Sequence, residues 1–431
     1  MNYPVLQVAL DLVDFARAEK IAAEAVKGGA DWVEAGTPLI KAEGLSAVRK
    51  LRRLFPDNTI VADMKIMDAG RIEVEAAAKA GADIVTVLGA ATDETVAECV
   101  LACRNYGAKL ELDLIGVADP VRRARRAEEL GVDFIGVHCA IDEQMRGKTA
   151  FDTLKKIRKA VTVPIAVAGG INSETVSAAA RSGADILIVG GAITKAVSPS
   201  KAAAGLKKAL KAGKKIKSEY FVRKSNEAEV REIFSRVSAS NVSDAMHRQG
   251  DLAGIVPLSP GFKICGRAVT VRTYPGDWSK PVQAIDRAGK SDVIVIDAGG
   301  VGPAVWGELA TAGARKKGIA GVIVDGAVRD ASEIRKLKFP VFSRLIMPRA
   351  GEPKGLGEIG VPVTAGGVRI FEGDWIVADD DGVCAVPAKS AVEVANRAMN
   401  VLEAENRLRK EINDGSTLGK VTELLKWEKP K

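Results

Sequence analysis

Residues 63–68 have the sequence Asp63-Met64-Lys65-Ile66-Met67-Asp68 and follow a β-branched run that indicates a strand. Because side chains alternate along a strand, Asp63 and Lys65 should point to the same side, whereas Asp68 should lie beyond the strand in a loop. Two carboxylates and an ammonium in this position can bind a divalent cation, shift the pKa of the lysine or stabilise an oxyanion. An ion-pair network without a catalytic role is the alternative.

The composition is that of a soluble globular chain: 431 residues, of which 47% are hydrophobic and 27% charged. Such a length predicts about two or three domains. No apolar run reaches the roughly 18 residues that span a bilayer, and the first residues lack a secretory signal pattern. Five cysteines without a Cys-x-x-Cys pair argue against a disulfide framework and a zinc site. We therefore expect a cytoplasmic protein.

The net charge of +8 is concentrated in residues 201–224, which contain nine Lys or Arg and one acid. Nine minus one equals the whole excess, so the rest of the chain is balanced. Such a short block favours a solvated helix end and a basic linker over 213–224. A contact with RNA or another polyanion is the less favoured alternative.

Eight strand-like runs alternate with helical runs rich in Ala, Glu, Lys and Arg before residue 212. This alternation predicts an α/β fold, a closed (β/α)8 TIM barrel over 1–212, with an open doubly wound sheet as the alternative. The expected strands are Leu6–Asp11, Asp31–Gly36, Thr59–Lys65, Asp83–Gly89, Lys109–Gly116, Phe134–His138, Pro164–Gly170 and Ile186–Ile193.

In a barrel of this kind, chemistry belongs at the C-terminal ends of the strands. Paired glycines end strands seven and eight, where backbone N–H groups can approach a phosphate, although a tight turn is the alternative. Together with the charged strand ends, they predict a site for a small sugar phosphate. The polar residues expected there are Asp11, Glu34, Asp63, Lys65, Glu111, Asp113 and His138, and the glycines are Gly169, Gly170, Gly190 and Gly191.

Three segments, 34–44, 62–70 and 138–144, closely resemble the 3-hexulose-6-phosphate synthases of the orotidine-phosphate decarboxylase superfamily. The resemblance covers about residues 3–212. It implies a reversible aldol condensation of formaldehyde with D-ribulose 5-phosphate to D-arabino-hex-3-ulose 6-phosphate. It also implies Mg2+ (or Mn2+) bound by Glu34 and Asp63. The 3-keto-gulonate-phosphate decarboxylases share this scaffold and are the alternative.

The chemistry of this reaction, together with the resemblance, assigns roles within the barrel. Lys65 would stabilise an enediolate, His138 would transfer the proton, and Asp11 would hold Lys65 and contact the sugar. Asp68 would reach into the site of a neighbouring subunit, which implies a dimer. Ala192 stands where the superfamily often has an arginine, so the phosphate should depend more on backbone groups. Those groups belong to Gly169, Gly170, Gly190 and Gly191.

The second half contains strand-like runs at 291–297 and 321–325 around a helical run at 308–317, and we expect a second domain over 225–431. Residues 225–410 resemble the regulators of ribonuclease E activity and the 4-hydroxy-4-methyl-2-oxoglutarate aldolases, which implies an α/β/α (swivelling) domain. The aldolases have an Asp, twenty intervening residues and an Arg-Asp pair; here Glu308 precedes Arg329-Asp330 at this spacing. By the resemblance, Asp330 would anchor a divalent metal and Arg329 would steady a pyruvate-like enolate. A simple charged turn is the alternative.

Two functions stay open for this second domain. It is either a second metal-dependent lyase acting on a 2-oxo acid or a regulatory or assembly module that binds a partner protein. The resemblances further imply a homo-oligomer, with dimer contacts through the barrels and three-fold contacts through the second domain. A closed assembly of six subunits would satisfy both.

Overall fold

The computed structural model describes residues 4–217, 223, 226 and 229–422. The chain divides into two compact units, one of Met1–Arg223 with Glu403–Lys431 and the other of Lys224–Leu402. The predicted domains assign residues 403–431 to the second domain, whereas the compact units group them with the barrel. Of the predicted linker, residues 218–222 and 224 lie outside the described ranges. No helix in the described ranges is long and apolar enough to cross a membrane.

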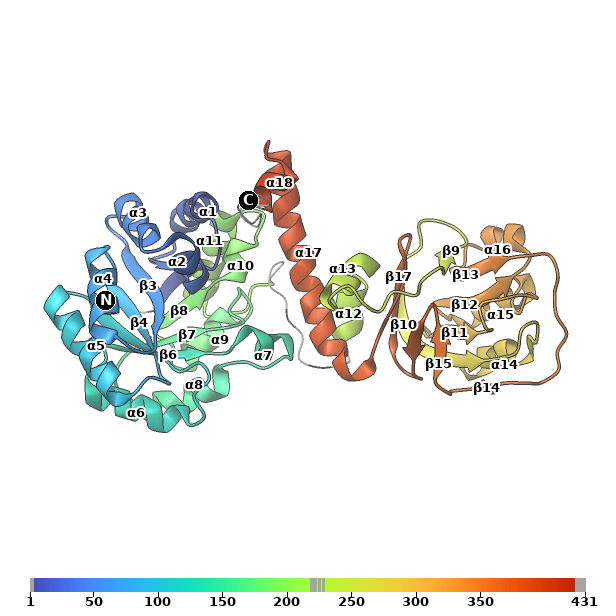
Figure 1. Cartoon of the computed structure of the whole chain (residues 1–431), viewed down its shortest axis with the longest axis horizontal. Helices are drawn as coiled ribbons and strands as arrows, with labels where there is room; N and C mark the ends of the chain where they lie inside the picture. The colour runs from blue at the N-terminus through green and yellow to red at the C-terminus, as the bar shows by residue number, and fades with distance from the viewer. Residues whose placement is uncertain (1–3, 218–222, 224–225, 227–228, 423–431) are drawn as a thin grey trace, which may run out of the picture. The chain divides into compact units, whose positions relative to one another are not determined.

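The first unit contains a closed barrel of eight parallel strands in sequence order, as predicted (Figure 1). The barrel closes where β8 pairs with β1, with Val5 opposite Ile186. The strands are β1 (Val5–Leu10), β2 (Trp32–Ala35), β3 (Thr59–Ile66), β4 (Ile84–Leu88), β5 (Lys109–Asp113), β6 (Phe134–His138), β7 (Ile165–Ala168) and β8 (Ile186–Val189).

Helices surround this barrel and bury small and aliphatic residues against it. The first, α1, shows why they form: Asp14 caps its N-terminus by accepting from Arg17 N, and its buried face repeats at helical spacing. The helices of this part are α1 (Phe15–Lys27), α2 (Thr37–Glu43), α3 (Ser46–Leu54), α4 (Gly70–Lys79), α5 (Asp93–Tyr106), α6 (Pro120–Leu130), α7 (Ile141–Met145), α8 (Phe151–Arg158), α9 (Val176–Arg181), α10 (Gly191–Thr194) and α11 (Pro199–Ala212).

A repeated glycine and aspartate fix the start of alternate strands. The glycine of each pair has a positive φ, which lets the chain leave the helix and enter the strand. The aspartate two residues after each glycine accepts a hydrogen bond from one backbone amide. This amide lies at the start of the preceding strand of the barrel. These bonds are Leu6 N to Asp31 (2.7 Å), Ile60 N to Asp83 (2.7 Å), Leu110 N to Asp133 (2.9 Å) and Ile165 N to Asp185 (2.9 Å).

Apolar side chains fill the N-terminal end of the barrel. Trp32 and Phe134 meet edge to face there, with their ring centroids 5.9 Å apart. Val5, Val61 and Ile186 are packed in the same cluster. Because this end is closed by side chains, a cavity can only open at the C-terminal ends of the strands.

The second unit is built on a mixed sheet with the order β18-β17-β10-β11-β12-β13-β9. Its centre, β10 to β13, is parallel, whereas β17, β18, β9 and β14 pair antiparallel. The strands are β9 (Val256–Pro257), β10 (Ile264–Arg272), β11 (Val293–Asp297), β12 (Gly321–Val328), β13 (Val341–Ile346), β14 (Glu358–Ile359), β17 (Trp375–Asp379) and β18 (Gly382–Val386), and a separate hairpin is formed by β15 (Val363–Ala365) and β16 (Val368–Ile370).

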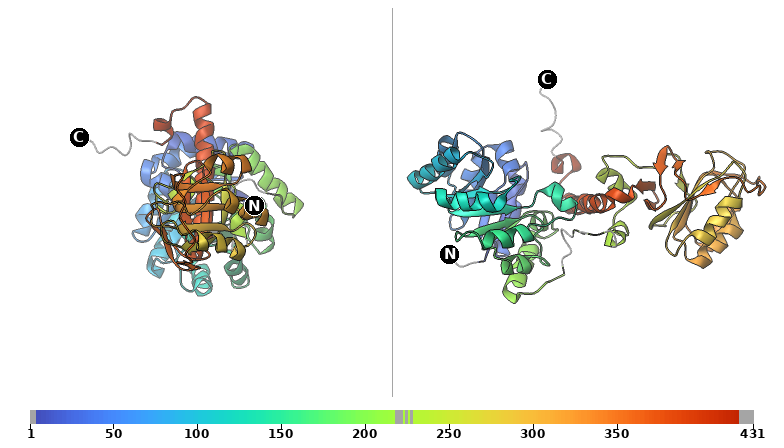
Figure 2. Two further views of the ribbon diagram at one scale, coloured as in Figure 1. Left: turned by 90° about the vertical axis from the view of Figure 1, so that its right-hand side faces the viewer. Right: turned by 90° about the horizontal axis from the view of Figure 1, so that it is seen from below.

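Helices α14 to α16 cover one face of this parallel centre, as Figures 1 and 2 both show. The opposite face packs against the β15–β16 hairpin, and a third cluster joins β17 and β18 to α12, α13 and α17. This arrangement confirms a second α/β domain after the barrel. The helices are α12 (Val230–Phe234), α13 (Ala239–Ala245), α14 (Ser279–Arg287), α15 (Glu308–Lys317), α16 (Ala331–Leu337), η2 (Ala388–Ser390), α17 (Ala391–Asn413) and α18 (Leu418–Val421).

One expected strand end differs in the second unit. The sequence suggests that the strand ends at Asp325, but β12 continues to Val328. Asp325 is therefore buried within the strand, where it pairs with Arg344 at 2.5 Å and accepts from Gly366 N at 2.7 Å. This carboxylate stabilises the fold around β12 and does not belong to a terminal charged turn.

Candidate active site

A bulge in β3 places Asp63 and Lys65 in the barrel's cavity. The ladder to β4 shifts between Ala62 and Ile66, so the intervening residues leave the regular pairing. Lys65 has a φ of 49°, which is uncommon for a residue with a side chain, and its amide donates to Thr86 Oγ1 at 3.0 Å. Both charged side chains line the same cavity, as the strand alternation predicts, although a bulge and not a regular strand achieves this.

The Lys65 ammonium lies between two carboxylates from different strands. Its Nζ is 3.1 Å from Asp63 Oδ1 and 2.9 Å from Asp113 Oδ2. Burial lowers the pKa of Lys65, but Asp113 and Asp63 outweigh burial and raise it above its ordinary value. Lys65 is therefore a permanent cation near neutral pH. Asp63 and Asp113 thus hold Lys65, whereas the predicted holder Asp11 lies in the same cavity without such a contact.

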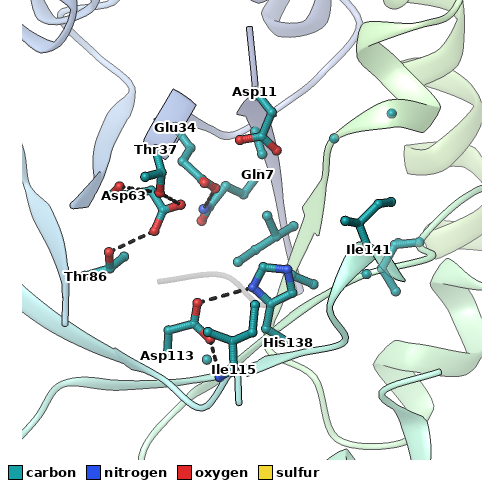
Figure 3. Close-up of a pocket in the computed structure, with 18 of the residues that line it drawn as sticks. Gln7, Asp11, Glu34, Thr37, Asp63, Thr86, Asp113, Ile115, His138 and Ile141 are labelled. Atoms are coloured by element: carbon teal, nitrogen blue, oxygen red, sulfur yellow. Dashed lines mark hydrogen bonds and ion pairs between the residues drawn. The ribbon is translucent and has the colours of Figure 1, made fainter. Parts of the chain in front are cut away.

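Asp113, the last residue of β5, also orients His138 at the end of β6 (Figure 3). Its Oδ2 lies 3.2 Å from His138 Nδ1, and its Oδ1 accepts from Ile115 N at 2.9 Å. Burial raises the pKa of Asp113, but His138 and Lys65 bring it down to about 2. Because an ionised carboxylate only accepts, the hydrogen of a neutral imidazole must be on Nδ1, and Nε2 is left as the acceptor.

Three carboxylates gather on the opposite side of the cavity, from the ends of β1, β2 and β3 (Figure 3). Asp63 Oδ2 accepts from Thr37 Oγ1 at 2.7 Å, and Glu34 Oε2 accepts from Gln7 Nε2 at 2.6 Å. Burial, Asp63 and Asp11 together raise the pKa of Glu34 well above its usual range. Burial and Asp63 likewise raise the pKa of Asp11. Crowded acids of this kind favour a bound cation, because it would relieve their repulsion.

The residues fit a divalent cation bound by Glu34 and Asp63. Among the described residues, no group of three or more His, Cys, Asp or Glu side chains is arranged to hold a metal. Mg2+, however, commonly takes only one or two protein carboxylates and completes its shell with water and substrate oxygens. The pair of acids in the cavity meets that requirement.

The predicted glycines form another wall of this cavity. Gly169 and Gly170 have φ values of 99° and 75°, which other residues rarely adopt. A Cβ at Gly169 would come within 2.6 Å of the Cys139 carbonyl oxygen, so this glycine permits close packing of two loops. The cavity has a volume of about 520 Å³, a size typical of small-molecule sites.

Most of the predicted barrel residues thus come together in one cavity, but Asp68 does not. It is exposed in the turn between β3 and α4 and is not part of the lining. Its predicted role toward a neighbouring subunit stays a prediction. The lining also contains polar residues without a predicted role, namely Gln7, Thr37, Thr86, Gln144, Thr194 and Lys195.

The predicted residues of the second unit also meet at its surface. Arg329 Nε lies 3.2 Å and 3.1 Å from the two carboxylate oxygens of Asp330, and Glu308 N donates to Asp330 Oδ2 at 3.3 Å. Glu308 begins α15, and Asp330 precedes α16 with a left-handed φ of 58°. The spacing in the sequence therefore brings the backbone of Glu308 to the Asp330 carboxylate at two helix starts.

The fold and the cavity define the first unit as a (β/α)8 barrel with a charged site at the C-terminal ends of its strands. Residues 4–206 match the family described as "Orotidine 5'-phosphate decarboxylase / HUMPS family", and residues 239–385 match the RraA-like family, described as "Aldolase/RraA". The chain thus belongs to the orotidine 5'-phosphate decarboxylase/HUMPS family through its barrel and carries an RraA-like domain after it.

Curated relatives place the barrel more narrowly. The 3-hexulose-6-phosphate synthase of Mycobacterium gastri is 41% identical over 205 residues, which cover 48% of this chain and 99% of the relative. The synthase of Bacillus subtilis (strain 168) is 41% identical over 209 residues, with coverages of 48% and 99%. These similarities confirm the resemblance expected from the sequence.

Solved structures similar to each half are also known. The 3-hexulose-6-phosphate synthase from Salmonella typhimurium has 37% identity and a TM-score of 0.47, covering 49% of this chain and all of that one. RraAS2 from Streptomyces coelicolor, described as an unusual member of the RNase ES inhibitor RraA family, has 29% identity and a TM-score of 0.40. It covers 43% of this chain and 98% of its own.

Proposed function

We propose that the barrel catalyses the reversible aldol condensation of formaldehyde with D-ribulose 5-phosphate to D-arabino-hex-3-ulose 6-phosphate. The observation that carries this proposal is the network of Asp63, Lys65, Asp113 and His138 in one cavity. A cation beside a histidine with a fixed tautomer can remove a proton next to a carbonyl and stabilise the charge that develops. The identity of about 40% with proteins named 3-hexulose-6-phosphate synthase supports it.

The proton transfer follows from the hydrogen bond between Asp113 and His138. Nε2 of His138 accepts the proton from C1 of the ketose, because Nδ1 is engaged by the Asp113 carboxylate. Asp113 stabilises the imidazolium that forms. Removal of this proton leaves negative charge on O1 and O2 of the substrate, and the resulting carbon nucleophile attacks formaldehyde.

Lys65 stabilises this enediolate charge. Its ammonium is held in place by Asp63 and Asp113 before the substrate arrives, so little reorganisation is needed during the reaction. Glu34 and Asp63 would hold Mg2+ (or Mn2+), and the ion would supply Lewis-acid stabilisation of the substrate oxygens. The phosphate would lie at the wall formed by the glycines, against the backbone of Gly169, Gly170, Gly190 and Gly191.

The experiment that tests this function uses the whole chain with D-ribulose 5-phosphate, formaldehyde and Mg2+. We expect both carbon substrates to disappear in equal amounts, and EDTA to stop the reaction until Mg2+ is restored. A parallel assay with 3-keto-L-gulonate 6-phosphate measures the alternative decarboxylation. Release of CO2 there, without consumption of formaldehyde in the first assay, would reject the synthase.

For the second domain we propose a metal-dependent lyase that acts on a 2-oxo acid. The meeting of Glu308, Arg329 and Asp330 at two helix starts supports this proposal. The Asp330 carboxylate suits a divalent cation bound partly through water, and the Arg329 guanidinium suits the carboxylate of a 2-oxo acid.

The whole chain with the substitution Asp63→Ala, which removes the barrel's proposed activity, should decarboxylate oxaloacetate with Mg2+ or Mn2+. A second substitution, Asp330→Ala, should abolish this turnover. If the chain shows no turnover with either metal, the domain is better explained as a regulatory or assembly module.

A further inference from the structure

A second lysine, Lys195, lines the barrel cavity beside the proposed phosphate wall. It follows α10, and Gly190, Gly191 and Thr194 line the cavity next to it. Among the described residues that line this cavity, the basic side chains are those of Lys65, Lys195 and His138. Because Lys195 directly follows the segment that contains Gly190, Gly191 and Thr194, it is the better placed cation for an anion at the glycine wall.

The C-terminal part of α17 holds the chain directly after Lys195. Arg407 Nη1 donates to the carbonyl oxygens of Ala196 (3.3 Å) and Val197 (3.4 Å). Arg407 is only 8% exposed, and its Nε donates to Glu411 at 2.9 Å. Glu411 in turn lies 3.2 Å from Arg17 of α1. This segment therefore contacts the barrel both directly after Lys195 and at α1.

A buried ion pair acts electrostatically on Lys195. Arg223 Nη2 lies 3.4 Å from Glu403 Oε2, and the two side chains are 9% and 5% exposed. Arg223 thus differs from the solvated linker residue expected from the sequence. Burial and Arg223 lower the pKa of Lys195 to about 8, against the opposing influence of Glu403 and Asp11. Lys195 is therefore charged at neutral pH but titrates just above it.

We propose that residues 403–422 complete the anion site of the barrel by positioning Lys195 as the cationic contact for the phosphate of the sugar phosphate. The family match ends at residue 206, so this segment is an addition to the barrel. The identity of the sugar rests on the proposed function, whereas the anion site itself does not.

The pH dependence of binding follows from the groups that act on Lys195. Loss of its proton above about pH 8 removes the charge that faces the phosphate, so affinity should fall as the pH rises through this value. Glu403→Gln removes a charge that raises the pKa of Lys195 and should move this fall to lower pH. Arg223→Met removes a charge that lowers it and should move the fall to higher pH.

The test measures direct binding of D-ribulose 5-phosphate and of inorganic phosphate by calorimetry, together with KM and kcat, for the whole chain. Lys195→Met should weaken binding of both ligands and raise KM for the sugar phosphate about tenfold or more, because a charge-assisted hydrogen bond is lost. Lys195→Arg should restore most of the affinity. Lys208→Met, which removes an exposed lysine of α11, is the matched control and should bind normally.

Two results would overturn the proposal. One is unchanged affinity in Lys195→Met; the other is a pH profile that shifts in the same direction, or not at all, in the Glu403 and Arg223 variants. If one of these two variants does not fold, the direction in which the pH profile of the other shifts decides between acceptance and rejection. A failed aldol assay with normal phosphate binding would reject the proposed reaction and leave the anion site intact. A wild-type chain that binds neither ligand would reject the anion site.

Discussion

At the scale of single residues, charge pairing decides what the cavity can do. Lys65 contacts Asp63 from its own strand and Asp113 from β5. Asp113 also orients His138. Neighbours therefore keep Lys65 a cation and Asp113 an anion, and Asp113 fixes the hydrogen of a neutral imidazole on Nδ1. A site prepared in this way needs little rearrangement as substrate charge develops.

Asp63→Ala and Lys65→Ala should each abolish hexulose-phosphate formation while the barrel stays folded. Loss of one preorganised charge typically costs about 10²–10³-fold in kcat, and these residues contribute to more than one contact. Steady-state assays with circular dichroism would measure both effects. Lys109→Ala is the control, because Lys109 begins β5 at the opposite end of the barrel. Normal turnover in either cavity variant would contradict the assignment.

Asp113→Asn should lower kcat by about 10²–10⁴-fold, the range expected when a carboxylate that orients a histidine is neutralised. The amide keeps the size of the side chain but no longer fixes the hydrogen on Nδ1 or pairs with the Lys65 charge. The pH–rate profile and the melting temperature should be measured together. Asp119→Asn is the control, since Asp119 is an exposed N-cap and Asn caps equally well. Equal rates in the two variants would exclude this role for Asp113.

At the scale of elements, the strand ends could be predicted, whereas the contacts between them could not. The alternation of apolar runs, with Gly and Asp before several strands, was sufficient to indicate eight βα units. The link between Lys65 and Asp113 joins residues 48 apart and depends on the bulge in β3, which no local pattern encodes. The pairing of Arg223 with Glu403 spans 180 residues, so the basic run around Arg223 looked like a solvated linker.

In the second unit, Asp277 connects the start of α14 to the loop at 354–356. Its carboxylate accepts from Ser279 N at 3.0 Å, Lys354 N at 3.2 Å and Leu356 N at 2.8 Å. Burial raises the pKa of Asp277, but hydrogen bonds from the Ser279 hydroxyl and from these three amides lower it from 3.8 to about 2. Because the folded pKa is depressed, the stabilisation is present above about pH 4 and is lost as the pH falls toward 2.

Asp277→Asn should therefore destabilise this loop at neutral pH by about 1–2 kcal/mol, the usual contribution of hydrogen bonds to an ionised group. Hydrogen exchange of residues 352–357, corrected for intrinsic rates, should show protection that falls between pH 6 and pH 3 in the wild type. The variant should be weakly protected at both values. Asp286→Asn, an exposed change on α14, should behave as the wild type does. Equal protection in all three proteins would contradict the assigned role.

At the scale of the whole molecule, one chain combines two domains whose relatives occur separately. The relatives of the barrel are covered almost completely by about half of this chain, and the RraA-like match begins only at residue 239. The resemblances imply two-fold contacts through the barrel and three-fold contacts through the second domain. Both can be satisfied together in a closed assembly of six subunits.

We therefore predict a particle of about 272 kDa, six times the chain mass of 45.4 kDa, in light scattering or native mass spectrometry. Co-expression of Lys65→Ala and Asp68→Ala chains tests the subunit contact directly. If Asp68 acts in the neighbouring site, mixed dimers regain one complete site and some activity, although each variant alone is inactive. Asp57→Ala is the control and should be active alone. Asp57 is also an exposed acid, but it lies before β3, whereas Asp68 lies after it. A monomeric or dimeric mass would reject the six-subunit assembly, and mixed dimers without activity would reject the shared site.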